Sequence, residues 1–205
     1  TRIVTGAVLT FGATTADYLH EPQGAVVIGD DGRILWRGVR QSLPEAWRAA
    51  PVDDYGDCLI LPGFIDAHIH FPQYRMLAAP GKDLLDWLNR FTFPEESRYG
   101  DAAYAAAAAE KFLDRLVTNG TTSAMVFSSV HKSCAEALFA AAGTRRMAIL
   151  TGKTMMDRDV PEAVRDTPEA GARDSEALYQ KWHRRDRLRY VVSPRFAVTS
   201  SEAQL

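Results

Sequence analysis

The sequence predicts an α/β protein in which a small β-sandwich-like module precedes the first about four units of a (β/α)8 barrel of the TIM type. Residues 1–61 hold short apolar runs separated by turn residues, as in a small β-rich module. Residues 62–205 alternate short apolar runs with longer segments of helical period, which is typical of parallel βαβ units. We therefore expect two modules, 1–61 and 62–205, that meet at a packed junction.

The clearest signal in the first module is a hairpin. Apolar residues at 25–29 and 33–36 flank a turn in which Gly32 can adopt a positive φ. Residues 44–50 predict one short helix, and the apolar run at 58–61 predicts a further strand. The module should therefore consist of short strands with one helical segment.

The first barrel strand is expected at residues 61–71, where two histidines stand two residues apart. Ile65 and Ile69 suit a buried strand. Because side chains alternate along a strand, Asp66, His68 and His70 should project from the same face. Two neighbouring imidazoles can share one metal ion, and a carboxylate on the same face can orient them.

A long connection follows this strand, at residues 72–100. Four of its apolar side chains recur at helical spacing, namely Leu84, Trp87, Leu88 and Phe91. This spacing predicts one or two helical turns, which we expect Pro94 to end. A connection of this length often forms the wall or lid of an active site.

The remaining chain continues the alternation. Strands are predicted at 121–127, 147–150 and 188–192. A helix is predicted at 104–117, capped by Asp101, stopped by Asn119-Gly120 and packed into the core through one stripe of side chains. Further helices are predicted at 132–142 (stopped by Gly143) and from Asp174 or Ser175, and residues 200–205 are predicted to form the first turn of another helix. Half of a barrel leaves two open strand edges, so we expect the chain to be the N-terminal part of a longer protein.

Composition and charge exclude several classes of partner. The 24 basic and 26 acidic residues give a net charge of -2, so the chain lacks the excess of positive charge that binding to nucleic acid or to an anionic membrane requires. No apolar run is long enough to span a bilayer. Cys58 and Cys134 lie far apart, so a disulfide framework or a cysteine-based zinc site is not expected. A reducing, cytoplasmic setting fits this cysteine usage.

The two histidines alone leave their role open between a metal site and ordinary packing. The end of a barrel strand favours a metal site, and imidazole suits zinc, iron or nickel. His68 and His70 are nevertheless too few, since a catalytic zinc usually has three or more protein ligands. His20 and His183 read as ordinary histidines, whereas His131 could face the same mouth.

Residues 62–70 resemble the first metal motif of the amidohydrolase superfamily, and the chain as a whole is similar to its guanine deaminases. The further matching segments are Phe71-Pro72-Gln73, residues 85–88, residues 92–96, residues 119–122, Gly152-Lys153, Met156-Asp157 and residues 193–196. The His-x-His motif is specific only to the superfamily. The Thr-Phe-Pro-Glu-Glu and Pro-Arg-Phe segments are the ones that favour guanine.

This resemblance implies one zinc ion per subunit, held by His68 and His70 together with a histidine and an aspartate from later strands. It also implies a proton-shuttling glutamate in a His-x-x-Glu motif, which the chain does not contain. The implied reaction is hydrolytic deamination of guanine to xanthine and ammonia in purine catabolism and salvage, by water whose pKa the zinc lowers. The chain alone should therefore be inactive. The family further implies a homodimer.

The resemblance also implies that His70, Gln73, Arg195 and Phe196 contact the purine. A glutamine amide offers both a donor and an acceptor, which suits the mixed edge of guanine, and an arginine can donate to its carbonyl or a ring nitrogen. Lys153 leaves open a carbamylated lysine between two metals, although a structural lysine is favoured.

Two rival functions remain. One is a related amidohydrolase deaminase or chlorohydrolase that acts on another amino-purine, a pyrimidine or a triazine. The other is a non-catalytic, amidohydrolase-like scaffold that works by oligomerisation. The second type of zinc deaminase is excluded, because its H-x-E and P-C-x-x-C signature is absent from the chain.

Overall fold

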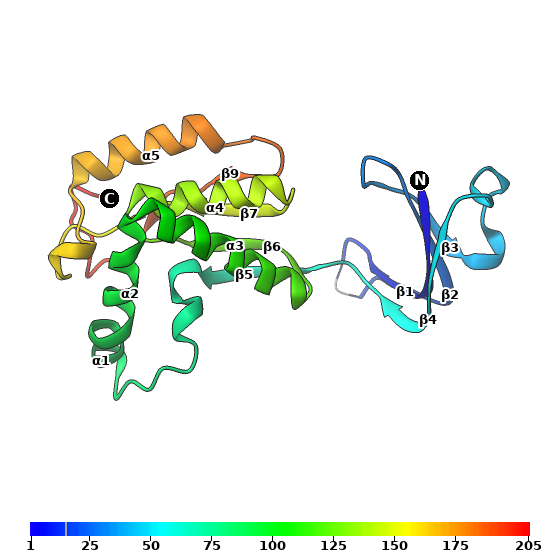
Figure 1. The fold of residues 1–205 in the computed structure, drawn as a ribbon, viewed down its shortest axis with the longest axis horizontal. Helices are drawn as coiled ribbons and strands as arrows, with labels where there is room; N and C mark the ends of the chain where they lie inside the picture. The colour runs from blue at the N-terminus through cyan, green and yellow to red at the C-terminus, as the bar shows by residue number, and fades with distance from the viewer. Residues whose placement is uncertain (15) are drawn as a thin grey trace. The chain divides into compact units, whose positions relative to one another are not determined.

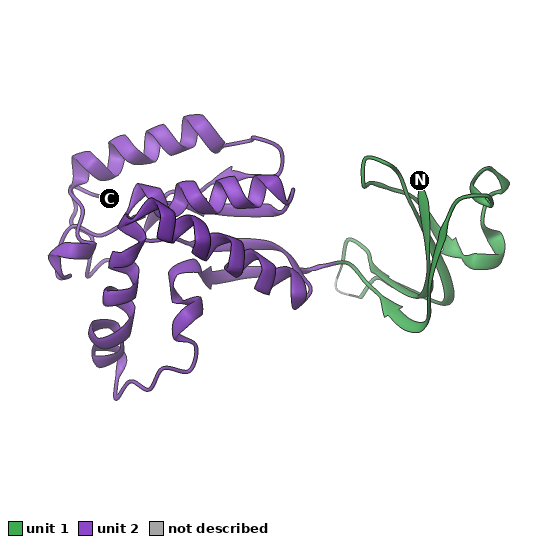
Figure 2. Ribbon diagram, viewed as in Figure 1, with its two compact units in different colours: residues 1–62 green, residues 63–205 purple. Residues whose placement is uncertain are grey.

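The computed structural model describes residues 1–14 and 16–205, which form two compact units (Figures 1 and 2). The N-terminal unit comprises residues 1–62 and the C-terminal unit residues 63–205. Within the described part of the chain, every helix is too short or too polar to cross a membrane.

The N-terminal unit is a four-stranded sheet in the order β3-β2-β1-β4. Its strands are β1 (Arg2–Phe11), β2 (Tyr18–Ile28), β3 (Ile34–Val39) and β4 (Val52–Ile60). β2 runs antiparallel to both β1 and β3, and β4 runs parallel to β1. The predicted hairpin is confirmed, because Gly32 has φ +79° and Gly29 N–H donates to the Arg33 carbonyl across 2.8 Å.

Two details of this unit differ from the prediction. β1 and β2 contain 10 and 11 residues and are therefore not short. The helix predicted at 44–50 is only a 3-10 turn, Glu45–Trp47, after a second turn at Arg40–Ser42. Pro44 starts the turn, and Trp47 packs against the small core around Ile3 and Val27, so tertiary contacts limit its length.

The C-terminal unit holds a parallel sheet in the order β5-β6-β7-β9. Its strands are β5 (Phe64–His70), β6 (Thr121–Phe127), β7 (Ala148–Gly152) and β9 (Arg189–Tyr190). Beyond them, β8 (Thr154–Met155) pairs with β10 (Ser193–Pro194). Helices α3 (Ala102–Thr118), α4 (Lys132–Thr144) and α5 (Pro168–Trp182) connect the strands and lie side by side in Figure 1. The predicted alternation of strand and helix is confirmed.

α3 shows how the sequence sets this architecture. The Asp101 carboxylate accepts from the amides of Ala103 and Tyr104, as expected of a helix cap. Gly120 follows the helix with φ +84°, a conformation that favours glycine. The predicted stripe is core packing, because Phe112 and its neighbours are buried against α4 and the sheet. α4 ends at Thr144, one residue beyond the Gly143 that was predicted to stop it.

The connection after β5 is almost continuously helical. It contains the 3-10 segments Phe71–Met76 and Arg98–Gly100, the helices α1 (Leu84–Trp87) and α2 (Phe93–Ser97), and the π-helical segment Leu88–Thr92 between them. The prediction that Pro94 ends the helix is wrong. Pro94 lies in the first turn of α2, directly after the π-helical segment, and the helical conformation continues through it to Ser97.

One later prediction was also wrong. α5 begins at Pro168 and not near residue 175, because the Thr167 hydroxyl caps it by accepting from the Ala170 amide and a proline is favourable at the first helical position. A 3-10 turn, Glu162–Val164, precedes it. The single turn predicted from residue 200 is present, and in it the amides of Gln204 and Leu205 donate to the Ser201 carbonyl.

Ile65 was expected to be buried and is 79% exposed. β5 pairs only with β6 among the described strands, so it forms an edge of the sheet. An edge strand has a neighbour on one side alone, which leaves part of its apolar surface uncovered.

Candidate functional site

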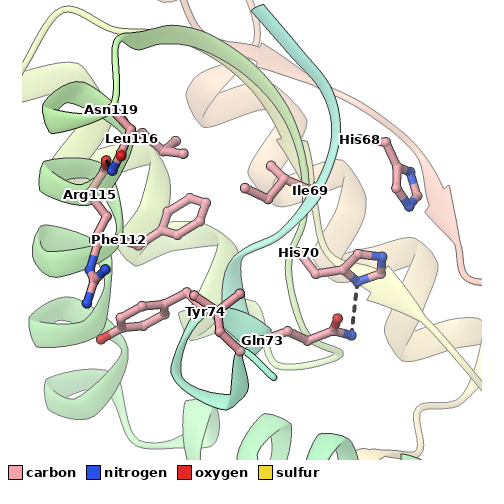
Figure 3. Close-up of a pocket in the computed structure, with 10 residues that line it drawn as sticks. His68, Ile69, His70, Gln73, Tyr74, Phe112, Arg115, Leu116 and Asn119 are labelled. Carbon is pink, nitrogen blue, oxygen red and sulfur yellow. Dashed lines mark hydrogen bonds between the residues drawn. The ribbon is translucent and has the colours of Figure 1, made fainter. Parts of the chain in front are cut away.

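Two imidazoles mark the carboxyl end of β5. Figure 3 shows His68 and His70 on one side of the strand and Ile69 on the other, as the strand period predicts. Their ring centroids lie 5.2 Å apart with planes at 75°. The ring of Phe127, at the end of β6, stacks on His70 at 4.9 Å and meets His68 edge-on at 5.6 Å. The parallel pairing of β5 with β6 thus places the Phe127 ring against both histidines.

Asp66 does not orient these imidazoles as expected. Its carboxylate accepts from the backbone N–H of His68 across 3.0 Å, so it stabilises the strand and leaves the rings to other partners. The side chain beside His70 is Gln73, whose Nε2 lies 3.3 Å from His70 Nδ1. A glutamine amide has a donor and an acceptor, and it can therefore match either tautomer of the ring.

His70 is held in its neutral form. Burial lowers its pKa to about 4, and the nearby charges of Arg195 and His68 act in the same direction. A neutral imidazole has a free ring-nitrogen lone pair, which is the form that binds metal ions.

A buried ion pair lies next to this histidine. Arg195 Nη1 donates to both carboxylate oxygens of Glu96, at 2.8 and 2.7 Å. The two side chains are 7% and 0% exposed, although 99 residues separate them in the sequence. Burial raises the pKa of the Glu96 carboxyl, and the guanidinium of Arg195 opposes that rise. Gln73 Nε2 also lies 3.5 Å from Glu96 Oε1. The four side chains His70, Gln73, Glu96 and Arg195 are therefore connected.

Strand β8 supports Arg195. The backbone N–H of Arg195 donates to the carbonyl of Met155 in β8 across 3.1 Å, next to the pairing of β8 with β10. Phe196 follows and is 43% exposed, so its ring is available to a ligand. The strand ends thus place Arg195 beside the connection that carries Glu96.

The other predicted candidates lie outside this group of contacts. Lys153 is 2% exposed and forms an ion pair with Asp166. The ring of His131 lies against Gly100, and burial, followed by the charge of Lys153, lowers its pKa. His183 accepts from the Tyr190 amide across 3.2 Å. His20 is an exposed residue of β2 in the N-terminal unit.

The histidine pair fits a zinc ion in part. Imidazole nitrogen is a suitable ligand, and the neutral state of His70 is the one required. Over residues 1–14 and 16–205, however, no group of three or more His, Cys, Asp or Glu side chains is arranged to hold a metal. His68 and His70 would therefore supply two ligands of a larger set.

A cavity adjoins the pair. Its volume is about 530 Å³, within the range of small-molecule sites, and it reaches from His68, His70 and Gln73 to Phe112 and Leu116 on α3 (Figure 3). It shares His70 and Gln73 with the contacts described above.

Sequence reasoning assigned no role to Glu96 or to Phe127. The segment that contains Glu96 was recognised as a match, but neither periodicity nor charge indicates that this carboxylate is fully buried. The only signal was a Pro-Glu-Glu run in a connection expected to form an active-site wall.

Comparison with known proteins supports these observations. The Amidohydrolase family model matches residues 59–205. A guanine deaminase of Escherichia coli K12 is 45% identical in an alignment of 202 positions that covers 93% of this chain and 45% of that protein. The chain thus spans about half the length of such relatives.

Solved structures show the same likeness. The structure of E. coli guanine deaminase superposes with a TM-score of 0.91 at 38% identity, over 100% of this chain and 49% of its own. A guanine deaminase from C. acetobutylicum, with guanine bound, gives 0.88 at 27% identity over 99% and 48%.

A more distant structure, the zinc-complexed chlorohydrolase TrzN of Arthrobacter aurescens, shares the fold alone, with a TM-score of 0.81 at 14% identity over 100% of this chain and 49% of its own. Together the comparisons confirm the predicted fold class, an α/β barrel of the metal-dependent hydrolase type whose first about four units lie in this chain.

Proposed function

Because this chain belongs to the amidohydrolase family, we propose that it contributes metal ligands and purine-binding side chains to an enzyme that hydrolyses guanine to xanthine and ammonia. The observation that carries the proposal is the connected group His70, Gln73, Glu96 and Arg195, which joins a neutral histidine at a strand end to a buried cation. In the reaction, the bond from the purine carbon to the exocyclic amine breaks, and a bond to a water oxygen replaces it.

We assign His68 and His70 as ligands of one zinc ion per subunit. Zinc, when bound, lowers the pKa of a water molecule so that hydroxide is available near neutral pH. The chain's own contribution is to hold two imidazoles at the end of β5, with His70 neutral and packed against Phe127. The remaining ligands and the proton-shuttling glutamate are expected from later strands.

The purine is assigned to His70, Gln73, Arg195 and Phe196. Arg195 uses only Nη1 toward Glu96, and in the described residues its Nε and Nη2 make no hydrogen bond, so three N–H donors remain for an acceptor edge. Gln73 can present an acceptor and a donor to the amide-like edge of guanine. The exposed ring of Phe196 can cover a purine face.

Substrate preference tests this function. The full-length, zinc-loaded protein should convert guanine with kcat/KM at least about 100-fold above adenine, cytosine or isoguanine, because a site that hydrogen-bonds one base leaves buried groups unpaired with the others. Steady-state assays of ammonia release measure this ratio. A preference for another base would identify that base, and not guanine, as the substrate. A protein that binds no metal and converts none of the bases would be a non-catalytic scaffold.

The family resemblance further supports a homodimer, a cytoplasmic setting and a role in purine catabolism. Light scattering on the full-length protein tests the dimer: twice the subunit mass is the expected result, and a monomer at working concentration would contradict it.

A further inference from the structure

We propose that Glu96 is a positioning residue that holds Arg195 and Gln73 in place for the purine, a role that rests on the proposed deamination of guanine. Glu96 lies on α2, within the connection between β5 and α3, and in the described part of the chain its carboxylate accepts hydrogen bonds from Gln73 and Arg195 and not from the histidine pair. It acts through the two side chains that meet the substrate.

The first argument is burial. The Glu96 side chain is fully inaccessible, and a buried carboxylate is costly unless its charge and its lone pairs are matched. Arg195 and Gln73 supply that match, from the loop after β10 and from the segment after β5. A buried ion pair contributes little net stability compared with apolar packing, so its presence here calls for a role other than stability.

The second argument is the geometry at Arg195. Both carboxylate oxygens take the same nitrogen, Nη1, and do not form a fork across Nη1 and Nη2. This arrangement anchors one corner of a planar, rigid guanidinium and leaves the other donors for a ligand. A carboxylate that only neutralised the charge would be expected to engage the fork in full.

The third argument is the link to Gln73. Its Nε2 lies 3.5 Å from Glu96 Oε1 and 3.3 Å from His70 Nδ1. Glu96 therefore contacts the two residues assigned to the purine, and one of these reaches the metal ligand His70. Removing the negative charge of Glu96 should therefore displace both Gln73 and Arg195 from their positions in the substrate site.

The adjacent Glu95 provides a matched control. It lies on the same helix, but its carboxylate bonds the Tyr104 hydroxyl and pairs with the half-exposed Arg98, which ties α2 to α3 near the surface. Glu95 thus illustrates a structural carboxylate, and Glu96 differs from it in burial and in partners.

The test uses the full-length, metal-loaded protein and steady-state kinetics with guanine. Glu96→Gln should raise KM by about tenfold or more, because the ion pair and one of the two acceptor oxygens for Arg195 are lost, while kcat changes by less than about threefold. Glu96→Asp keeps the charge at shorter reach and should restore part of the loss. Glu95→Gln should leave KM within about twofold of wild type.

A double-mutant cycle separates positioning from a general structural effect. In an Arg195→Lys background, Glu96→Gln should change KM by less than about threefold, because the partner that it positions is already altered. Additive effects would overturn the proposal, as would an unchanged KM in a folded Glu96→Gln protein with full metal content. Failure of both Glu96→Gln and Glu96→Asp to fold would assign Glu96 a purely structural role.

The same experiment distinguishes the two levels of inference. A wild-type protein that binds metal without converting guanine overturns the proposed function and this role with it. Guanine turnover in wild type with unaltered kinetics in Glu96→Gln overturns the positioning role alone.

Discussion

Replacing His68 by alanine should lower kcat/KM for guanine by at least about 1,000-fold and release the bound metal from the full-length protein, because a catalytic zinc depends on each of a few protein ligands. The His68 side chain is exposed, and within the described part of the chain its ring contacts are those with His70 and Phe127, so its loss removes little packing. The unfolding midpoint of the metal-free protein should therefore stay near the wild-type value. Metal content by elemental analysis, measured beside activity, checks both parts.

His20→Ala is the matched control. His20 is also an exposed strand histidine, but it lies in the N-terminal unit. It should leave metal content and activity unchanged, within about twofold. A His68→Ala protein that retains one tightly bound metal and wild-type activity would remove His68 from the site.

The second large effect is structural and concerns Gly152, the last residue of β7. A Cβ added there would lie 1.8 Å from the carbonyl oxygen of Val191, which is backbone and cannot rotate away. The backbone N–H of the same Val191 donates to the Thr151 carbonyl across 2.9 Å. β7 and the segment that contains Val191 therefore cannot move apart without losing that hydrogen bond. Gly152→Ala should therefore destabilise the protein by about 3 kcal/mol or more.

This loss corresponds to a fall in the unfolding midpoint of about 6–12 °C. Thermal unfolding followed by circular dichroism measures it. Gly143→Ala in α4 is the control. The added Cβ would lie at an ordinary 3.6 Å from the Leu188 side chain, and alanine stabilises a helix relative to glycine by up to about 1 kcal/mol. Equal midpoints for the two variants would show that β7 and the Val191 segment are not packed as described.

Local signals in the sequence predicted much of the C-terminal unit. The cap at Asp101 and the stop at Gly120 fixed α3, because both act through bonds within a few residues. The start of α5 was missed although Thr167 and Pro168 form a good helix start, since Asp174 and Ser175 offered a competing cap. The π-helical segment at Leu88–Thr92 has no comparable signature, which is why Pro94 was misjudged.

The site was less predictable than the fold, for a physical reason. The spacing of His68 and His70 placed them on one face because both belong to one strand. The contact between Glu96 and Arg195 joins residues 99 positions apart, and it depends on how the long connection folds over the strand ends. Hydrophobic periodicity reports only local structure and carries no information on such a contact, so the burial of Glu96 could be identified only from the structure.

If this function is right, metal and purine meet in one site built from β5 and the segment after β10. The visible spectrum of the cobalt(II)-substituted full-length protein, titrated with guanine, tests this arrangement. We expect a saturable change in the cobalt bands, because a purine held by Gln73 and Arg195 lies beside His70. A cobalt spectrum that stays unchanged at saturating guanine would contradict it.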